Sequence, residues 1–275
     1  MGREYRVMAA LRPVYPYVPR MLAFCDDPEV LGDEFYVMER LEGIIPRQDL
    51  PDDLGLDASG VRRMCRNVVD KLIELHRVDW QGTELEQLGK GAGYVERQIH
   101  GWTDRYARAR TDNVGDFSSV TDWLKEHMPA DRDARVIHND FRLDNVVLDA
   151  DDPERVIGVL DWEMATLGDP LMDLGNSLAY WVQADDDKVF QQMRRQPSNA
   201  AGMMTRAEII EYYGEQTGYD VSDFDYYLVY GLFRLAVIVQ QIYYRYHHGQ
   251  TADERFADWH RITNYLEQRC NSLIE

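Results

Sequence analysis

The segment "VIHNDFRLDNVVLD", residues 136–149, places a histidine, two asparagines and three acids between two apolar runs. Short apolar runs bounded by polar residues are typical of buried strands. A polar loop between two such strands is held against a core, where proteins often place residues that do chemistry. We therefore expect a strand, a functional loop and a second strand here, and the fold prediction is built outward from them.

The residues downstream of this loop predict one more strand and then helices. "RVIGVLDW", residues 155–162, is an apolar strand that contains Gly158 and carries Asp161 near its end. Asp169 and Pro170 suit the N-cap and first turn of a helix that continues through "LMDLGNSLAYWV". Residues 203–216, 223–247 and 253–274 predict further helices.

Upstream of the loop, residues 57–75 predict a long helix with one buried face. Its apolar positions recur at helical spacing over about five turns, and Asp57 is a suitable N-cap. Residues 94–110 and 117–128 predict two more helices. The loop therefore lies within a mainly helical region.

The first 45 residues have a different character. "GREYRVMAAL", residues 2–11, favours a short helix, which the prolines of "RPVYPYVP" end. "RMLAFC" and "EFYVMERL" predict two neighbouring strands, and "EGIIPRQDLPDDLG" after them is irregular. We predict an α+β fold in two units: a small, partly β unit over residues 1–45, and a mainly helical unit over residues 46–275 that contains a small sheet.

The charge of the chain excludes some classes of partner. There are 49 Asp and Glu residues against 30 Lys and Arg, a formal net charge of −19 at pH 7, and no basic stripe. Because such a chain repels phosphate backbones, we expect no nucleic acid and no membrane as partner. Three widely spaced cysteines without metal-ligand spacing favour a reducing, cytoplasmic location.

Three polar residues of the loop have a spacing with a chemical meaning. His138, Asp140 and Asn145 fit H-x-D-x-x-x-x-N, the loop in which protein kinases keep a catalytic base and a magnesium ligand. Arg142 could reach the transferred phosphate and offset its charge, or form a surface ion pair. Asp161, 16 residues beyond Asn145, is placed for a second metal-binding oxygen. The pattern predicts phosphoryl transfer.

Taken together, several segments resemble the aminoglycoside phosphotransferase-type, kinase-like superfamily. The likeness is greatest to the branch found alone in bacteria or fused to acyl-CoA dehydrogenases. The segments that carry it lie between residues 2 and 246: "GREYRVMAAL", "FYVMERLEG", "GYVERQIHGW", "VIHNDFRLDN", "VIGVLDWEMATLGDPLMDLG" and "YYLVYGLFRLAVIVQQIYYRY".

This resemblance implies a protein-kinase-like fold of two lobes that uses ATP and Mg²⁺ to phosphorylate a hydroxyl of a small molecule. Asp140 would be the base, and Asn145 with Asp161 would bind magnesium. The connector whose backbone meets adenine would comprise Met38, Glu39 and Leu41. By analogy alone, the association with dehydrogenases points to a hydroxylated acid or an acyl thioester as the acceptor.

The chain departs from the superfamily pattern before its first helix. Members normally begin with a hairpin over the ATP phosphates and a strand whose lysine pairs with a helix glutamate. Glu4 matches that glutamate, but neither lysine nor hairpin precedes it. We therefore expect an N-terminally truncated small lobe, impaired catalysis, and a free sheet edge that could pair in a homo-oligomer. The alternative is a non-catalytic binding or regulatory remnant of such a kinase.

Some residues have simpler interpretations. His138 is expected to be a structural histidine that bonds the loop backbone, and Asp169 a helix cap rather than a metal ligand. Asp173 either braces the loop or is an ordinary helix-face acid. A third hypothesis makes His138 and Asp140 ligands of a hydrolytic metal centre, which is disfavoured because no second histidine has ligand spacing.

Overall fold

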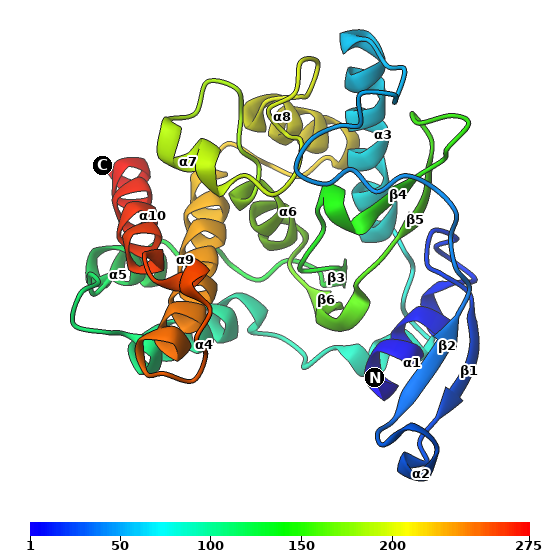
Figure 1. Cartoon of the computed structure of the whole chain (residues 1–275), viewed down its shortest axis with the longest axis horizontal. Helices are drawn as coiled ribbons and strands as arrows, with labels where there is room; N and C mark the ends of the chain where they lie inside the picture. Colours follow the sequence, from blue (N-terminus) through cyan, green and yellow to red (C-terminus); the bar gives the residue numbers. More distant parts are fainter.

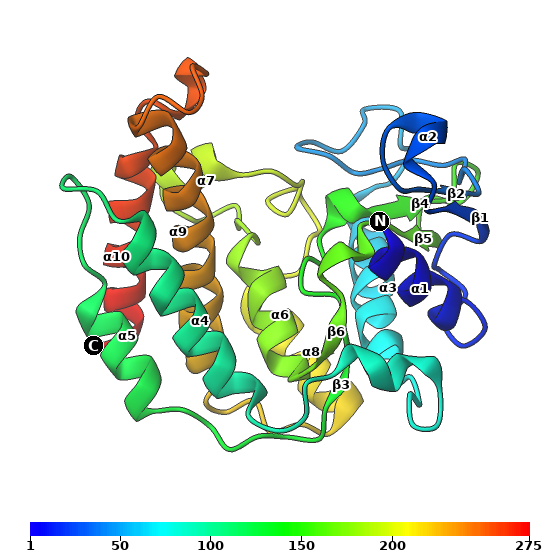
Figure 2. The ribbon, with the colours of Figure 1, turned by 90° about the horizontal axis from the view of Figure 1, so that it is seen from below.

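A computed structural model describes residues 1–275 and shows a small N-terminal part beside a larger helical body (Figure 1). In Figure 2 the N-terminal helix and strands lie on one side of the molecule, and α4, α5, α9 and α10 lie on the opposite side. The small sheets and α6 lie between these two groups. The predicted mixture of a helical body with little sheet is therefore confirmed.

The elements follow one another along the chain with short connections. The N-terminal part contains α1 (Gly2–Leu11), β1 (Met21–Cys25), α2 (Pro28–Leu31) and β2 (Phe35–Met38). The body contains α3 (Ala58–His76), α4 (Tyr94–Ala109), α5 (Ser118–Glu126), β3 (Arg135–Ile137), β4 (Val146–Leu148), β5 (Val156–Val159), β6 (Thr166–Gly168), α6 (Pro170–Ala179), α7 (Lys188–Met193), α8 (Arg206–Thr217), α9 (Asp225–His247) and α10 (Trp259–Ile274). Four 3₁₀ turns complete it, at Glu84–Leu88, Leu143–Asn145, Trp162–Met164 and Glu254–Phe256.

The strands form three antiparallel ribbons of two strands each, β1–β2, β3–β6 and β4–β5. The segment after β2 is fastened to the body because Ile44 and Leu148 exchange backbone hydrogen bonds of 2.9 and 2.8 Å. Leu41 packs against the backbone of β5, since a Cβ atom on Gly158 would lie 2.1 Å from the Leu41 side chain. The glycine inside this strand therefore makes room for the connector.

Helix α9 forms the centre of the body and packs against α4, α6 and α10. Most of its residues between Tyr226 and Tyr243 are buried, which fits its nearly continuous apolar and aromatic sequence. Helices α6 and α9 approach closely where Gly175 faces Gly231. Helix α6 itself begins as expected, with the Asp169 side chain accepting hydrogen bonds from the N–H groups of Leu171 and Met172.

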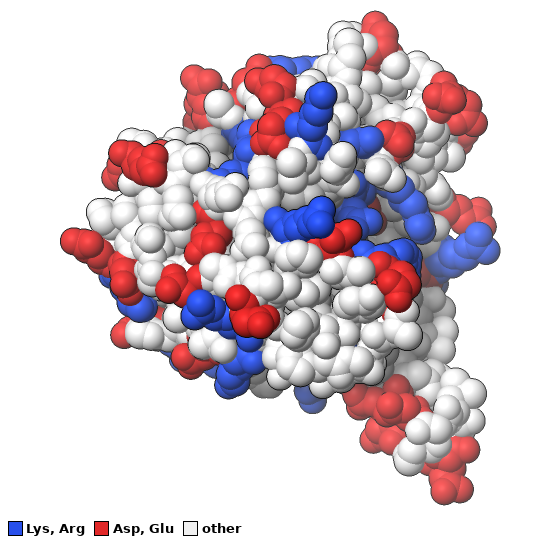
Figure 3. Space-filling view, turned by 60° about the vertical axis from the view of Figure 1, so that its left-hand side comes forward, with Lys and Arg blue, Asp and Glu red and all other residues white.

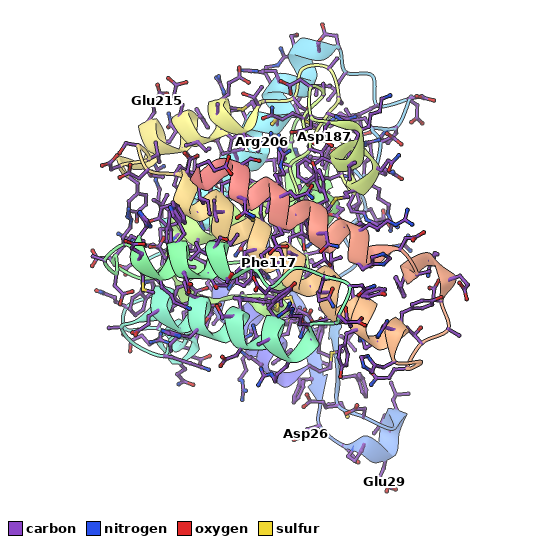
Figure 4. All side chains as sticks on the ribbon, turned by 90° about the vertical axis from the view of Figure 1, so that its left-hand side faces the viewer. Asp26, Glu29, Phe117, Asp187, Arg206 and Glu215 are labelled. Carbon is purple, nitrogen blue, oxygen red and sulfur yellow. The ribbon has the colours of Figure 1, made fainter.

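Short elements were the ones that the sequence did not predict. They are α2, α7 and β6, of four, six and three residues, and the region predicted as helix over 253–274 begins with a 3₁₀ turn before α10. The β1–α2–β2 segment projects from the body, with Asp26 and Glu29 at its tip (Figure 4). No helix combines the length and apolarity needed to cross a membrane. The division at residue 45 stays a prediction.

Candidate active site

The loop after β3 is anchored by one buried carboxylate. Asp173, on α6, has no exposed surface. Its Oδ2 accepts a hydrogen bond of 2.8 Å from the N–H of His138, and its Oδ1 accepts one of 2.7 Å from the N–H of Asn139. Asn139 has a φ of 65°, a conformation that asparagine adopts at lower cost than most residues. The bracing role that was left open for Asp173 is confirmed.

Asp173 is held in turn by a histidine from α3. His76 Nε2 lies 3.0 Å from Asp173 Oδ2, and His76 Nδ1 lies 2.7 Å from the Tyr213 hydroxyl of α8. Burial by itself would raise the pKa of Asp173, but the hydrogen bond from His76 and the backbone donors hold it below the usual value. An ionised carboxylate therefore fixes the loop to three helices.

His138 has the structural role expected of it. Its Nδ1 accepts a hydrogen bond of 3.2 Å from the N–H of Asp140, so its Nε2 donates to the Leu160 carbonyl at 2.9 Å. The residue is fully buried, and burial lowers its pKa. A neutral imidazole thus links the loop to the end of β5. No group of three or more His, Cys, Asp and Glu residues could hold a metal ion, so the hydrolytic metal centre has no support.

Asp140 and Asn145, the predicted base and metal ligand, lie together. Asn145 Nδ2 donates to the Asp140 carbonyl at 2.9 Å and lies 3.3 Å from Asp140 Oδ2. Both amide contacts use the nitrogen, so Asn145 Oδ1 is left for a cation. Asp140 is partly exposed, whereas Asn145 is buried. A hydroxyl or a hydrated ion can therefore reach the Asp140 carboxylate.

Asp161 lies close behind Asn145 along the neighbouring strand. The N–H of Leu160 donates to the Asn145 carbonyl at 2.8 Å, which places Asp161 one residue beyond that bond. Asp161 is exposed and has a φ of 67°, so the chain turns sharply at this carboxylate. Its charge contributes to raising the pKa of Glu4, whose largest cause is burial. Asp161 therefore lies between the catalytic loop and α1.

Arg142 makes ionic contacts within the loop. Its Nε lies 3.3 Å from Asp140 Oδ1 and 3.4 Å from Asp144 Oδ1, and its guanidinium lies 4.7 Å from the centre of the Tyr180 ring. Neither Arg142 Nε nor Asp144 Oδ1 has a hydrogen-bond partner in the buried surroundings. Burial raises the pKa of Asp144, although Arg142 acts in the opposite direction. This pair is poised to bond another molecule.

Several residues of this site were not among those predicted. Asp144 precedes a predicted ligand, so its place in the loop was a usable signal. Gln196 is fully buried and joins the loop to α6, since it accepts from the Leu143 N–H and donates to the Tyr180 carbonyl. No local pattern marks Gln196 or His76, because their partners are far away in the sequence.

The predicted adenine connector leaves β2 at the edge of this site. The N–H of Glu39 donates to the Arg20 carbonyl, and the Glu39 side chain accepts from the Arg20 N–H at 2.7 Å. These bonds hold the first turn of the connector and leave the Glu39 carbonyl and the Leu41 N–H without a partner in the protein. Met38 is 40% exposed. The connector therefore has one free backbone acceptor and one free donor.

A cavity of about 710 Å³ opens beside the loop, between α6, α7, α9 and α10. Eleven of its 17 lining residues are hydrophobic, and Arg142, Asp144 and Tyr180 belong to its wall. The other charged lining residues are Arg47 and Arg195. This volume is typical of sites for small molecules.

Comparison with known proteins agrees with these features. The family model described as "Phosphotransferase enzyme family" matches residues 1–209. Acyl-CoA dehydrogenase family member 10 of Mus musculus is 34% identical over 97% of this chain and 25% of its own length. Family member 11 of Homo sapiens is 34% identical over 92% of this chain and 32% of its own length. The chain thus spans between a quarter and a third of these relatives.

Solved structures share the fold. A crystal structure from Ralstonia eutropha, named provisionally as an aminoglycoside phosphotransferase, has a TM-score of 0.85 at 31% identity and covers 98% of this chain and 82% of that one. Aminoglycoside phosphotransferase APH(4)-Ia, in a ternary complex with AMP-PNP and hygromycin B, has a TM-score of 0.61 at 15% identity, again over 98% and 82%, a likeness of fold alone. The predicted kinase-like α+β fold, with a helical large lobe, is confirmed.

Proposed function

Because the chain belongs to the phosphotransferase enzyme family, we propose that it transfers the γ-phosphoryl group of ATP to a hydroxyl of a small molecule. One observation carries the proposal: Asp140 and Asn145 lie 3.3 Å apart on a loop whose backbone is fixed by the buried Asp173. A loop that holds a base and a metal-binding oxygen rigidly is what phosphoryl transfer requires.

The roles follow from the positions of the side chains. Asp140, which is partly exposed, would accept the proton of the acceptor hydroxyl. Asn145 Oδ1 and the Asp161 carboxylate would hold Mg²⁺, which when bound neutralises charge on the phosphates. Arg142, held between two carboxylates, would turn toward the transferred phosphoryl group.

The connector supports the use of ATP. An adenine ring offers a donor and an acceptor on one edge, and the Glu39 carbonyl and Leu41 N–H are free to meet them. Leu41 is fixed on Gly158, so its backbone is already positioned. We propose that Met38, Glu39 and Leu41 bind the adenine, as was expected from the sequence.

The cavity beside Asp140 is proposed to hold the acceptor. Its lining is mainly apolar, with Arg47, Arg142 and Arg195 against the single acid Asp144. A polycationic molecule would meet more positive than negative charge there, so polyamine-like antibiotics are poor candidates. An amphipathic molecule that bears a hydroxyl fits the lining better.

Purified protein incubated with Mg²⁺, ATP and a panel of hydroxylated metabolites tests this proposal. We expect a phosphorylated product, and Asp140→Asn is expected to lower its rate about 10²- to 10⁴-fold. Asp151→Asn, which changes an exposed acid in the loop after β4, is the control and should leave the rate unchanged. A protein that binds Mg-ATP but phosphorylates nothing, while full-length relatives are active, would contradict the proposal.

Turnover by residues 1–275 alone is proposed to be impaired. Glu4 matches the glutamate that pairs with a lysine in the superfamily, yet no lysine forms an ion pair with it in this structure. The competing function is a non-catalytic binding or regulatory domain. A thermal shift of several degrees with Mg-ATP would favour the phosphotransferase, and no shift would favour the alternative.

Two features of the surface support further parts of the proposal. The β1–β2 ribbon exposes Leu22, Val37 and Met38, and no third strand pairs with either edge. We propose that a second copy pairs there, so light scattering should show dimers, and Val37→Lys should reduce them. A monomer at all concentrations would contradict this. The three free cysteines support a cytoplasmic location.

A further inference from the structure

One charged side chain in the body lacks any partner. Arg234 lies in the middle of α9 and is 4% exposed, yet it takes part in no ion pair and no hydrogen bond within the protein. Burying a guanidinium without an anion is costly, and buried charges in proteins are normally paired. A position with this cost and no structural return suggests a ligand.

The groups around Arg234 are aromatic. Its guanidinium lies 5.2 Å from the centre of the Trp102 ring of α4. Its charge also acts on the hydroxyls of Tyr94, Tyr180 and Tyr230, in each case against the burial that raises their pKa values. Faces of aromatic rings stabilise a cation only partly. The pocket around Arg234 thus supplies shape but no counter-charge.

This position adjoins the proposed acceptor cavity. The next residue, Leu235, lines the cavity together with Tyr180 and Arg142. Tyr180 feels the charge of Arg234 and also those of Asp140 and Arg142. Arg234 and the catalytic loop therefore flank the same tyrosine ring, so that one small molecule could contact both.

We propose that Arg234 is an anion-binding residue of the acceptor site, and that the acceptor carries a carboxylate in addition to its hydroxyl. The proposal rests on the proposed function and narrows its substrate class. A planar carboxylate matches the fork of a guanidinium and would form two charge-assisted hydrogen bonds. With Arg234 holding the carboxylate, the hydroxyl at the other end of the molecule would face Asp140.

Binding measurements separate this proposal from catalysis. Straight-chain hydroxy monocarboxylates and diols of matched length are titrated calorimetrically into the protein with Mg-ADP present. We expect the acids to bind about 10- to 100-fold more tightly than the diols. Arg234→Met should remove this preference, and Arg234→Lys should restore part of it. Arg105→Gln is the matched control, because Arg105 stacks at 4.4 Å on the same Trp102 ring but is exposed.

Stability without ligand distinguishes a binding residue from a structural one. Replacing an unpaired buried charge by methionine should raise the melting temperature of the free protein. An arginine that serves packing alone would lower it when replaced. Inorganic phosphate is titrated as well, and if it alone binds through Arg234 the carboxylate assignment is wrong.

The outcomes for the two proposals differ. Equal binding of acids and diols, no binding of either, or equal losses of both in Arg234→Met would overturn the anion site, even if diols are phosphorylated. Acids that bind through Arg234 without any phosphoryl transfer would support the anion site and contradict the phosphotransferase.

Discussion

Two buried residues, Asp173 and His138, decide the shape of the catalytic loop. Asp173 accepts the N–H groups of His138 and Asn139, and His138 bonds both to the N–H of Asp140 and to the Leu160 carbonyl. The loop therefore has few ways to relax, which suits a base that must meet a hydroxyl within about 3 Å. The cost of that rigidity is a dependence on two protonation states.

The stability of the protein should fall in mild acid because of His138. Burial lowers its pKa in the folded state, whereas in the unfolded chain it takes up a proton near pH 6.5. Below that pH the unfolded state binds the extra proton, so up to about 1.4 kcal/mol of stability is lost per pH unit until the folded pKa is reached. Denaturant unfolding between pH 7 and pH 5 measures this slope.

His138→Gln should flatten this dependence, whatever its effect at pH 7. His100→Gln is the control, since the His100 side chain is 59% exposed and makes no comparable contacts. Equal slopes in His138→Gln and the unmodified protein would show that His138 is protonated in the folded state as readily as in the unfolded one.

At the scale of elements, the site depends on how α6 and α9 meet. Asp173 and Tyr180 come from α6 or its end, while Arg234 and Leu235 come from α9. The two helices touch at Gly175 and Gly231, where a Cβ atom on Gly231 would lie 2.3 Å from the Gly175 carbonyl oxygen. Such close packing leaves the helices little freedom to separate.

Gly231→Ala should therefore destabilise the protein by about 1–3 kcal/mol or more, since backbone atoms cannot move aside cheaply. Gly101→Ala is the matched control, because it lies inside α4 with no atom near the added Cβ and should gain about 0.5–1 kcal/mol in helix propensity. Melting temperatures of both variants give the answer. A Gly231→Ala protein as stable as the parent would mean that the two helices can separate after all.

At the scale of the whole molecule, the charge of −19 acts on every element at once. Acidic side chains are spread over the face seen in Figure 3, including its projecting lower part. Attractive pairs exist, such as Asp186 with Arg206 and Arg269 at 2.7 Å, which join α8 and α10 beside Asp187, as Figure 4 indicates for Asp187 and Arg206. They are outnumbered by like charges.

Salt should stabilise the protein, because it screens the repulsion among these acids. Raising sodium chloride from low to physiological concentration is expected to contribute on the order of 1 kcal/mol, or roughly 2–4 °C in melting temperature. Calorimetry over a salt series measures this. A melting temperature that falls with salt would mean that ion pairs such as Arg206–Asp186 outweigh the repulsion.

How much the sequence could predict depended on the length of each pattern. The helix over residues 2–11 has the predicted bounds, and Asp57 and Asp169 cap the helices assigned to them. Such signals involve neighbours one to four residues apart. The strand β6 was missed, since three residues have no periodicity and this strand exists only because β3 pairs with it.

The sequence by itself determined the kinase-like loop, its flanking strands and the caps of its helices, because these depend on spacing within a few residues. Only the tertiary structure decided which distant side chains complete the site. His76 lies 97 residues from Asp173, and Arg234 is set beside Trp102 and Tyr180 by the packing of three helices. Contacts of this kind leave no local pattern, because they arise from how apolar faces pack against each other.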